Sequence, residues 1–376
     1  MDTIISFKYV RERVLDWWAV YGRHDLPWKK ASDQFDLKPS HEQTTCELDP
    51  YRIWIAEIML QQTQVGVMLP FWKRWMDAFP NVSLLAEAPL EEVLLIWQGL
   101  GYYRRAHSIH RASMNLKGDA WPRTLQGWML LPGIGRTTAG SILSSAFNLP
   151  FPILDGNVRR LLTRLTGCKE PPSKSVDSRL WRLSFLLLDK ERPRDFNQAL
   201  MDLGALVCTS RNPKCSLCPL VERCFAYSIG QQSSFPVKME SRRLSIQVIG
   251  VGVIFNQRGE VLIDQRKNDG LLGGMWEFPG GKQEQGEPIK STVSREIIEE
   301  LAITVEVGEE LISFAHAYSH KRLRFVVHIC EYVSGEPKPL ASQQVRWVEP
   351  KSLNKYPFPA ANTKIIDALM NYIKSI

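Results

Sequence analysis

The chain has 376 residues, of which 44% are hydrophobic and 23% are charged, and this globular balance excludes an intrinsically disordered protein. No run of residues is apolar enough for a membrane span, and the charged N-terminus lacks the apolar core of a signal peptide. Residues 1–227 hold most of the net charge of +7, because 29 basic against 23 acidic side chains leave +6 there, so this part is the expected binding site for a polyanion.

The apolar spacing divides the chain into two domains. Throughout residues 1–227 the apolar residues recur mostly at helical intervals, interrupted by a polar stretch, residues 33–48, that predicts a solvated loop. Residues 228–244 are polar, contain Gly and Pro, and predict a linker. Residues 245–376 alternate as strands do, with two helical runs among them. We therefore expect a multidomain protein, with an all-α domain followed by a smaller α+β domain.

Two carboxylates in the helical half are candidates for chemistry. Glu57 lies among apolar residues in AEIMLQQTQV, so it should be close to the core and have a raised pKa. Asp155 lies in ILDGNVRR, after a Pro-containing turn and before a helix. A surface salt bridge for Glu57 and a helix N-cap for Asp155 are the ordinary alternatives. Together, an acid and a carboxylate supply what cleavage of an N-glycosidic bond needs, a proton for the leaving base and a negative charge beside the sugar.

Residues 131–140 read LPGIGRTTAG and predict a tight connection between two helices, at about residues 123–145. Glycines let the backbone approach a phosphate closely, and the next helix offers free N–H groups. A helix-hairpin-helix of this kind holds DNA through its backbone without reading sequence. We expect DNA contacts from Gly133, Gly135, Thr137 and Thr138.

Four cysteines follow at intervals of C-x6-C-x2-C-x5-C, and they are Cys208, Cys215, Cys218 and Cys224. Four thiolates can hold a [4Fe-4S] cluster or a zinc ion, but structural zinc sites usually take two close pairs, and only one is present. We favour the iron cluster, on a loop whose interleaved basic residues would contact phosphates. These basic residues are Arg211, Lys214 and Arg223. The lone thiols elsewhere indicate a reducing cytosol.

In the second half, residues 281–303 read G-x5-E-x7-R-E-I-I-E-E-L-A-I, which resembles a Nudix box with Ala302 where that family usually has glycine. Glu296, Glu299 and Glu300 stand at i, i+3 and i+4, so a helix would place three carboxylates on one face. Such a face is either a Mg²⁺ site or a solvated surface.

The motifs together resemble MutY-type adenine DNA glycosylases of the endonuclease III superfamily. The resemblance rests on YRIWIAEIMLQQTQ, WQGLGYYRRA, LPGIGRTTAG, ILDGNVRR and the cysteine spacing, and it covers nearly the whole chain. It implies removal of adenine mispaired with 8-oxoguanine, with Glu57 as the general acid and Asp155 as the stabiliser of the oxocarbenium ion. Asn157 would orient these groups.

The same resemblance assigns residues that handle the flipped nucleotide. Gln62 would fill the gap in the duplex, and Leu100 and Tyr102 would lie beside 8-oxoguanine. Thr137 stands where strand-cleaving relatives have a lysine, so no Schiff base is expected from that position.

For the second domain the resemblance is to MutT, and it implies recognition of 8-oxoguanine. Tyr318, Ser319 and His320 resemble the Phe-Ser-His loop of MutY proteins that probes this base. Arg346 stands where MutT has a further metal-binding glutamate, so Mg²⁺ at the Nudix box is not expected to be required.

The sequence thus predicts a monofunctional adenine glycosylase that binds double-stranded DNA with A:8-oxoG or A:G mispairs, as a cytoplasmic, nucleoid-associated bacterial monomer. A bifunctional glycosylase and AP lyase, an additional 8-oxo-dGTP pyrophosphohydrolase and a noncatalytic lesion-binding protein are the alternatives.

Overall fold

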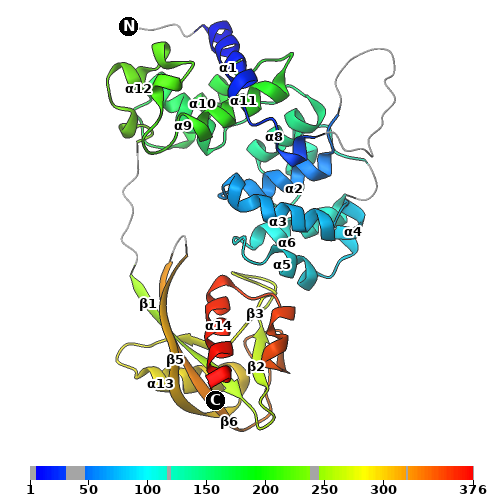
Figure 1. The fold of residues 1–376 in the computed structure, drawn as a ribbon, viewed down its shortest axis with the longest axis vertical. Coiled ribbons are helices and arrows are strands. Elements are labelled where there is room, and N and C mark those ends of the chain that lie inside the picture. The colour runs from blue at the N-terminus through cyan, green and yellow to red at the C-terminus, as the bar shows by residue number, and fades with distance from the viewer. Residues whose placement is uncertain (1–5, 31–46, 117–119, 238–244, 319–320, 376) are drawn as a thin grey trace. The chain divides into compact units, whose positions relative to one another are not determined.

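The computed structural model describes residues 6–30, 47–116, 120–237, 245–318 and 321–375 (Figure 1). Most of the predicted 33–48 loop therefore lies outside the described residues. The chain forms two compact units, each described by itself below. The first consists of Met1–Met68, Asn81–Ser83 and Arg111–Ser241, and the second of Leu69–Pro80, Leu84–His110 and Arg242–Ile376.

The described residues between 6 and 237 are mainly helical, as the apolar spacing predicts. The α-helices are α1 (Phe7–Tyr21), α2 (Pro50–Leu60), α3 (Val65–Ala78), α4 (Val82–Glu87), α5 (Leu90–Trp97), α6 (Arg104–Asn115), α7 (Leu125–Met129), α8 (Arg136–Phe147), α9 (Gly156–Thr166), α10 (Lys174–Leu187), α11 (Pro193–Leu206) and α12 (Phe225–Ser228). Short 3-10 helices are η1 (Pro27–Lys29), η2 (Cys215–Leu217), η3 (Val221–Arg223) and η4 (Gln232–Ser234).

The helices that carry the candidate site begin at side chains that cap them. Asp49 accepts hydrogen bonds from the first-turn amides of α2, and Asp155 and Ser173 do so for α9 and α10. A core of Val, Leu and Phe side chains from α1, α9, α10 and α11 packs behind these helix ends, and Leu162, Phe196 and Leu203 are fully buried in it. This packing fixes the positions of the polar groups at the start of α9.

The predicted linker begins as part of the first unit. Phe235 is buried, and its ring lies edge-on to Phe225, while the buried guanidinium of Arg164 donates to the carbonyls of Gln232 and Phe235. Residues 238–244 lie outside the described residues.

The second unit contains a mixed sheet, and its central pair, β1 and β6, is parallel from Ile246↔Arg322 to Phe255↔Glu331. The strand order is β3-β2-β1-β6-β5, with β4 paired to β1 and β7 to β2. The strands are β1 (Ile246–Phe255), β2 (Val261–Gln265), β3 (Trp276–Glu277), β4 (Gly280–Lys282), β5 (Thr304–Tyr318), β6 (Lys321–Ser334) and β7 (Gln344–Val348).

Two helices supply the apolar packing on the two sides of this sheet. Helix α13 (Ile289–Leu301) buries Val293, Ile297 and Leu301 in one core, and α14 (Ala360–Ser375) contributes Ile365 and Leu369 to the other. The 3-10 helix η5 (Pro350–Lys355) precedes α14. The predicted α+β domain is therefore present.

Candidate active site

Helix α2 brings Glu57 to the wall of a pocket while the rest of the helix is anchored in the core. Its neighbours Trp54, Ile55 and Ile58 are buried, and Glu57 itself is half-buried. Burial raises the pKa of Glu57 to about 7, the Ser141 hydroxyl and the Lys29 ammonium oppose this rise, and the Asp155 carboxylate adds to it. Glu57 therefore keeps a large protonated fraction at neutral pH.

Asp155 is both the N-cap of α9 and a wall of the same pocket. Its Oδ1 accepts from the amide of Val158 at 2.8 Å, and its Oδ2 accepts from Asn157 Nδ2 at 3.1 Å. The helix-cap alternative is thus correct, and it does not exclude a chemical role. The two bonds orient the carboxylate and leave it in a half-buried place beside Glu57.

The pocket that joins these residues has a volume of about 230 Å³. Since an apolar cavity of ~150 Å³ can hold a benzene ring, this pocket is large enough for a nucleobase. Glu57, Asp155 and Asn157, predicted from the sequence, share its wall with Trp28, Ser141 and Gln198, which sequence reasoning missed.

The hairpin between α7 and α8 is built as predicted. Gly133 has φ +78°, a left-handed conformation that favours glycine, and Gly135 precedes the first turn of α8. The two threonines face inward and line the pocket: Thr137 Oγ1 donates to the Leu154 carbonyl at 3.2 Å, and Thr138 Oγ1 accepts from Gln61 at 3.3 Å. Their predicted DNA contacts stay predictions.

Two predicted nucleotide-handling residues have left-handed backbones. Gln62, at the end of α2, is exposed with φ +59°, and Tyr102 is 45% exposed with φ +49°. Such conformations are costly for residues other than glycine and tend to occur at functional sites. Leu100, by contrast, is 7% exposed, and its predicted contact with 8-oxoguanine stays a prediction.

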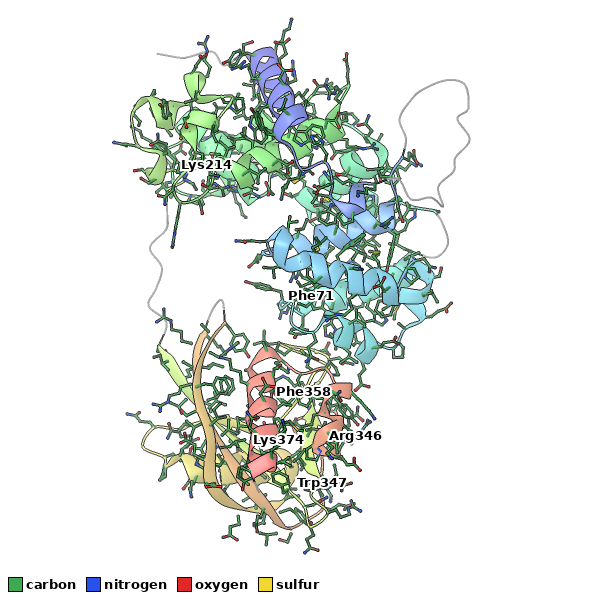
Figure 2. The ribbon with its side chains drawn as sticks, in the orientation of Figure 1. Phe71, Lys214, Arg346, Trp347, Phe358 and Lys374 are labelled. Carbon is green, nitrogen blue, oxygen red and sulfur yellow. The ribbon has the colours of Figure 1, made fainter. Side chains whose placement is uncertain are left out.

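The cysteines surround a small apolar pocket at the C-terminal side of α9. All four line it, together with Leu161, Leu165 and Arg164. Arg164 Nη1 lies 3.4 Å from Cys208 Sγ, and burial raises the pKa of Cys218 to about 12. The three basic residues of this loop are exposed, as a contact with phosphates requires. They are Arg211, Lys214, which is labelled in Figure 2, and Arg223.

Arg160 links the cysteine loop to Asn157 in the wall of the candidate pocket. Its guanidinium donates to the Cys208 carbonyl at 2.7 Å, to Asn157 Oδ1 at 2.8 Å and to the Gly204 carbonyl at 2.6 Å. A Cβ at Gly204 would meet Asn157 Cβ at 2.6 Å, so the glycine permits this close packing. The position of Asn157 therefore depends on the cysteine loop.

The carboxylates of α13, the acidic helix of the second unit, have partners within the protein. Arg295 pairs with Glu296 at 2.9 Å and with Glu299 at 3.3 Å, whereas Glu300 accepts from the Gly280 amide at 3.3 Å. Burial, and then the charge of Glu277, raises the pKa of Glu300 to about 7. Across the residues that the structure describes, no group of three His, Cys, Asp or Glu side chains is arranged to hold one metal ion.

The remaining predicted residues of this unit are only partly described. Tyr318 ends β5 and is partly buried, while Ser319 and His320 lie outside the described residues. Arg346, labelled in Figure 2, has its guanidinium 5.1 Å from the Trp276 ring centre and 5.5 Å from that of Tyr356. The Arg346 guanidinium therefore lies over two aromatic rings.

Sequence comparison finds three family models along the chain. Residues 55–184 match the HhH-GPD superfamily base excision DNA repair proteins, residues 208–224 the iron-sulfur binding domain of endonuclease III, and residues 250–368 the NUDIX domain. An adenine DNA glycosylase of Buchnera aphidicola subsp. Schizaphis graminum is 34% identical, covering 84% of this chain and 84% of that protein. The Homo sapiens adenine DNA glycosylase is 31% identical, over 93% of this chain and 72% of its own length.

The chain belongs to the adenine DNA glycosylase family. Members are hydrolases of the N-glycosidic bond, and the protein is therefore an enzyme of this class. Among solved structures, a thermostable thymine-DNA glycosylase is similar, with 26% identity, a TM-score of 0.49, and coverage of 59% of this chain and 97% of that one. The described helices include none that is long and apolar enough to cross a membrane.

As in other iron-sulfur glycosylases of this superfamily, the four cysteines hold a [4Fe-4S] cluster. The pocket fits that group, because four thiols converge on one apolar cavity. Four thiolates in so apolar a place would be costly without cations, and the irons supply that charge.

Purified protein should accordingly be brown and contain about four irons per chain. We expect Cys215→Ser to weaken DNA binding, because the cluster would no longer hold the basic loop in place. The change should also disturb Asn157, because Arg160 bonds both Asn157 and the Cys208 carbonyl. Metal analysis and mobility-shift titrations measure the two effects, with Cys168→Ser, a free cysteine outside the cluster, as the matched control. Stoichiometric zinc without iron would refute the assignment.

Proposed function

We propose that this protein hydrolyses the N-glycosidic bond of adenine mispaired with 8-oxoguanine or guanine in duplex DNA, and that it leaves the strand intact. The observation that carries the proposal is the pair in one pocket: Glu57, with a pKa near neutrality, and Asp155, whose two oxygens accept from an amide and a side-chain donor. The adenine DNA glycosylases among the relatives support the choice of base.

The chemistry follows from the difference between the two carboxyl groups. Protonated Glu57 gives its proton to a ring nitrogen of the flipped adenine, so the base leaves with the electron pair of the glycosidic bond. The sugar then carries positive charge, and the Asp155 carboxylate stabilises it. A water molecule from the solvent adds to the anomeric carbon, and the proton that this water loses balances the one that Glu57 gave. Asn157 and the Val158 amide keep that carboxylate in place.

Strand cleavage needs an amine that attacks the sugar, and Thr137 provides none at the position expected for it. We therefore expect single-turnover reactions with an A:8-oxoG duplex to give broken strands only after alkali. An A:T duplex is the control and should release almost no base. High-yield trapping on DNA by borohydride would show that an amine is acting and would overturn the monofunctional assignment; an uncleaved A:8-oxoG duplex after alkali would overturn the proposed function.

For the second unit we propose recognition of 8-oxoguanine, with no requirement for Mg²⁺. Two of the three box carboxylates already share Arg295, and the third has a pKa near 7 and accepts from a backbone amide. Groups of the protein itself therefore offset the negative charge on this face of α13. Arg346 adds positive charge where a further metal ligand would need negative charge.

We expect 8-oxo-dGTP incubated with Mg²⁺ and the protein to release no pyrophosphate above background. The matched variant is Glu296→Gln, which should change neither this result nor adenine release. Turnover in the wild type that disappears in Glu296→Gln would establish a hydrolase site.

Changing both Ser319 and His320 to Ala should reduce the preference for 8-oxoguanine over guanine opposite adenine, since these residues supply the polar contacts expected with the altered base. The ratio of single-turnover rates for the two mispairs measures this preference.

We further propose that the protein works as a monomer in the cytoplasm, at the nucleoid. Because the relatives include bacterial and human proteins, its bacterial source stays a prediction.

A further inference from the structure

Helix α5 and the turn after it belong to the second unit, together with the mixed sheet. The turn carries Leu100 and Tyr102, which the sequence assigns to 8-oxoguanine, and Tyr318 ends β5 of the same unit. Two groups of residues expected to contact one base therefore lie in one compact body. The contacts that hold these two groups in place are not used by the chemistry described above.

Two acceptors on α5 and at its end bind donors that are buried elsewhere in this unit. Oε1 of Glu91 accepts from the indole Nε1 of Trp276, in β3, at 2.6 Å. Oε1 of Gln98 accepts from the amide of Phe358, labelled in Figure 2, at 3.2 Å. Both aromatic residues are fully buried, and the amide of Trp276 donates to the Pro357 carbonyl at 2.9 Å. The segment before α14 is therefore bonded both to β3 and to the end of α5.

The turn after α5 has a left-handed backbone that is tied to the same segment. Gly99, Gly101 and Tyr102 have φ of +95°, +74° and +49°. The Tyr103 hydroxyl accepts from the Gly99 amide at 3.3 Å and donates to the Phe358 carbonyl at 3.5 Å. A left-handed backbone at a residue such as Tyr102 persists only where the surroundings fix it. A shift of Phe358 would therefore be passed on to Tyr102.

Phe358 also packs against the strands that lead to Tyr318. It lies in one buried apolar cluster with Phe325 of β6, and the ring of Phe314, in β5, stacks on Phe325 at 5.3 Å. Strand β5 continues from Phe314 to Tyr318. Because a close-packed core transmits displacements, the place of Phe358 fixes the turn after α5 relative to the end of β5.

We propose that Glu91 and Gln98 are positioning residues that set the preference for 8-oxoguanine over guanine opposite adenine. Their bonds to Trp276 and Phe358 keep the turn that carries Tyr102 in register with the end of β5. The inference rests on the proposed function, because it needs the second unit to recognise 8-oxoguanine. Contacts made with only one of two bases speed its reaction only when they are held in the productive geometry. Loss of the register should therefore slow the A:8-oxoG reaction and leave the A:G reaction almost unchanged.

The test is the ratio of single-turnover rates of adenine release from an A:8-oxoG and an A:G duplex. Gln98→Met and Glu91→Met each remove one acceptor and leave a side chain of similar length. We expect the ratio to fall about three- to tenfold in each, the size expected for one lost hydrogen bond. The rate with A:G should stay close to that of the wild type.

Conservative variants and a matched control separate the bonds from general stability. Gln98→Glu and Glu91→Gln keep an acceptor oxygen in the same place, and they should keep the wild-type ratio. The control is Gln283→Met, which removes a half-buried glutamine of the same unit whose side chain donates to the Glu287 carbonyl at 2.7 Å. It should also leave the ratio unchanged.

The ratio does not depend on the fraction of folded protein, because one preparation is assayed with both duplexes. A residue that only supports the fold would lower both rates equally, so an unchanged ratio in the Met variants would overturn the inference. If one Met variant does not fold, the other gives the answer. A ratio that falls as far in the conservative variants would also contradict it. A wild type that releases no adenine would instead refute the proposed function, and one that treats both mispairs alike would refute recognition by the second unit.

Discussion

Glu57→Gln should reduce adenine release by about 10²- to 10⁴-fold, the usual contribution of a general acid. The amide has nearly the same shape as the carboxylic acid, but it has no proton to give to the leaving base at neutral pH. Because the pKa of Glu57 is raised to about 7, the wild-type rate should be highest below pH 7 and fall above it. Single-turnover assays across this range measure both effects.

The substitution should leave binding of the mispaired duplex almost unchanged, because Glu57 lies in the pocket wall and the hairpin and basic loop stay intact. The matched control is Glu12→Gln, which removes only an exposed carboxylate that pairs with Lys8 on α1. A Glu57→Gln protein that releases adenine at the wild-type rate would show that another group supplies the proton.

The sequence predicts where the two carboxyl groups of the candidate pocket lie, because each signal is local. The apolar neighbours of Glu57 in α2 indicate burial, and the position of Asp155 before α9 indicates a cap. A cap and a chemical role do not exclude each other, because the two oxygens of this carboxyl group accept from separate donors beside the pocket. A capping bond fixes the side chain without removing its charge.

The supporting residues could not be predicted, because they come from distant parts of the chain. Lys29 bonds Gln198 across 169 positions, and Asp202 bonds Trp18 across 184. Arg160 is closer in sequence to Asn157, but its bond to the Cys208 carbonyl depends on how the cysteine loop folds back. No spacing rule connects such residues. The one signal in the sequence is that Lys29 directly follows the apolar pair Pro27 and Trp28.

In the second unit the helix with Glu296, Glu299 and Glu300 is predicted correctly, and the protein partners of its carboxylates could not be predicted. Helical spacing places their Cβ atoms on neighbouring positions, but each side chain follows its own partner. Arg295 draws Glu296 and Glu299, while the Gly280 amide holds Glu300. The backbone pattern was therefore sufficient for the fold and insufficient for the site.

Asp155→Asn should slow adenine release by about 10²- to 10³-fold, in the range measured for loss of one electrostatic stabiliser. Asparagine caps helices as well as aspartate does, so its carbonyl oxygen can still accept from the Val158 amide and α9 should begin at the same residue. Only the negative charge beside the sugar is lost. Single-turnover rates and the melting temperature together measure these expectations.

Asp155→Ala removes both the charge and the cap, so a comparison with Asp155→Asn, which removes only the charge, separates the two effects. Loss of the cap should cost about 0.5–2 kcal/mol of stability, which Asp155→Asn should not show. If the two variants are equally slow and only the alanine protein melts early, the charge accounts for the rate. If the asparagine protein instead reacts like the wild type, the carboxylate serves the helix alone, and the positive charge on the sugar must be stabilised by another group in the pocket.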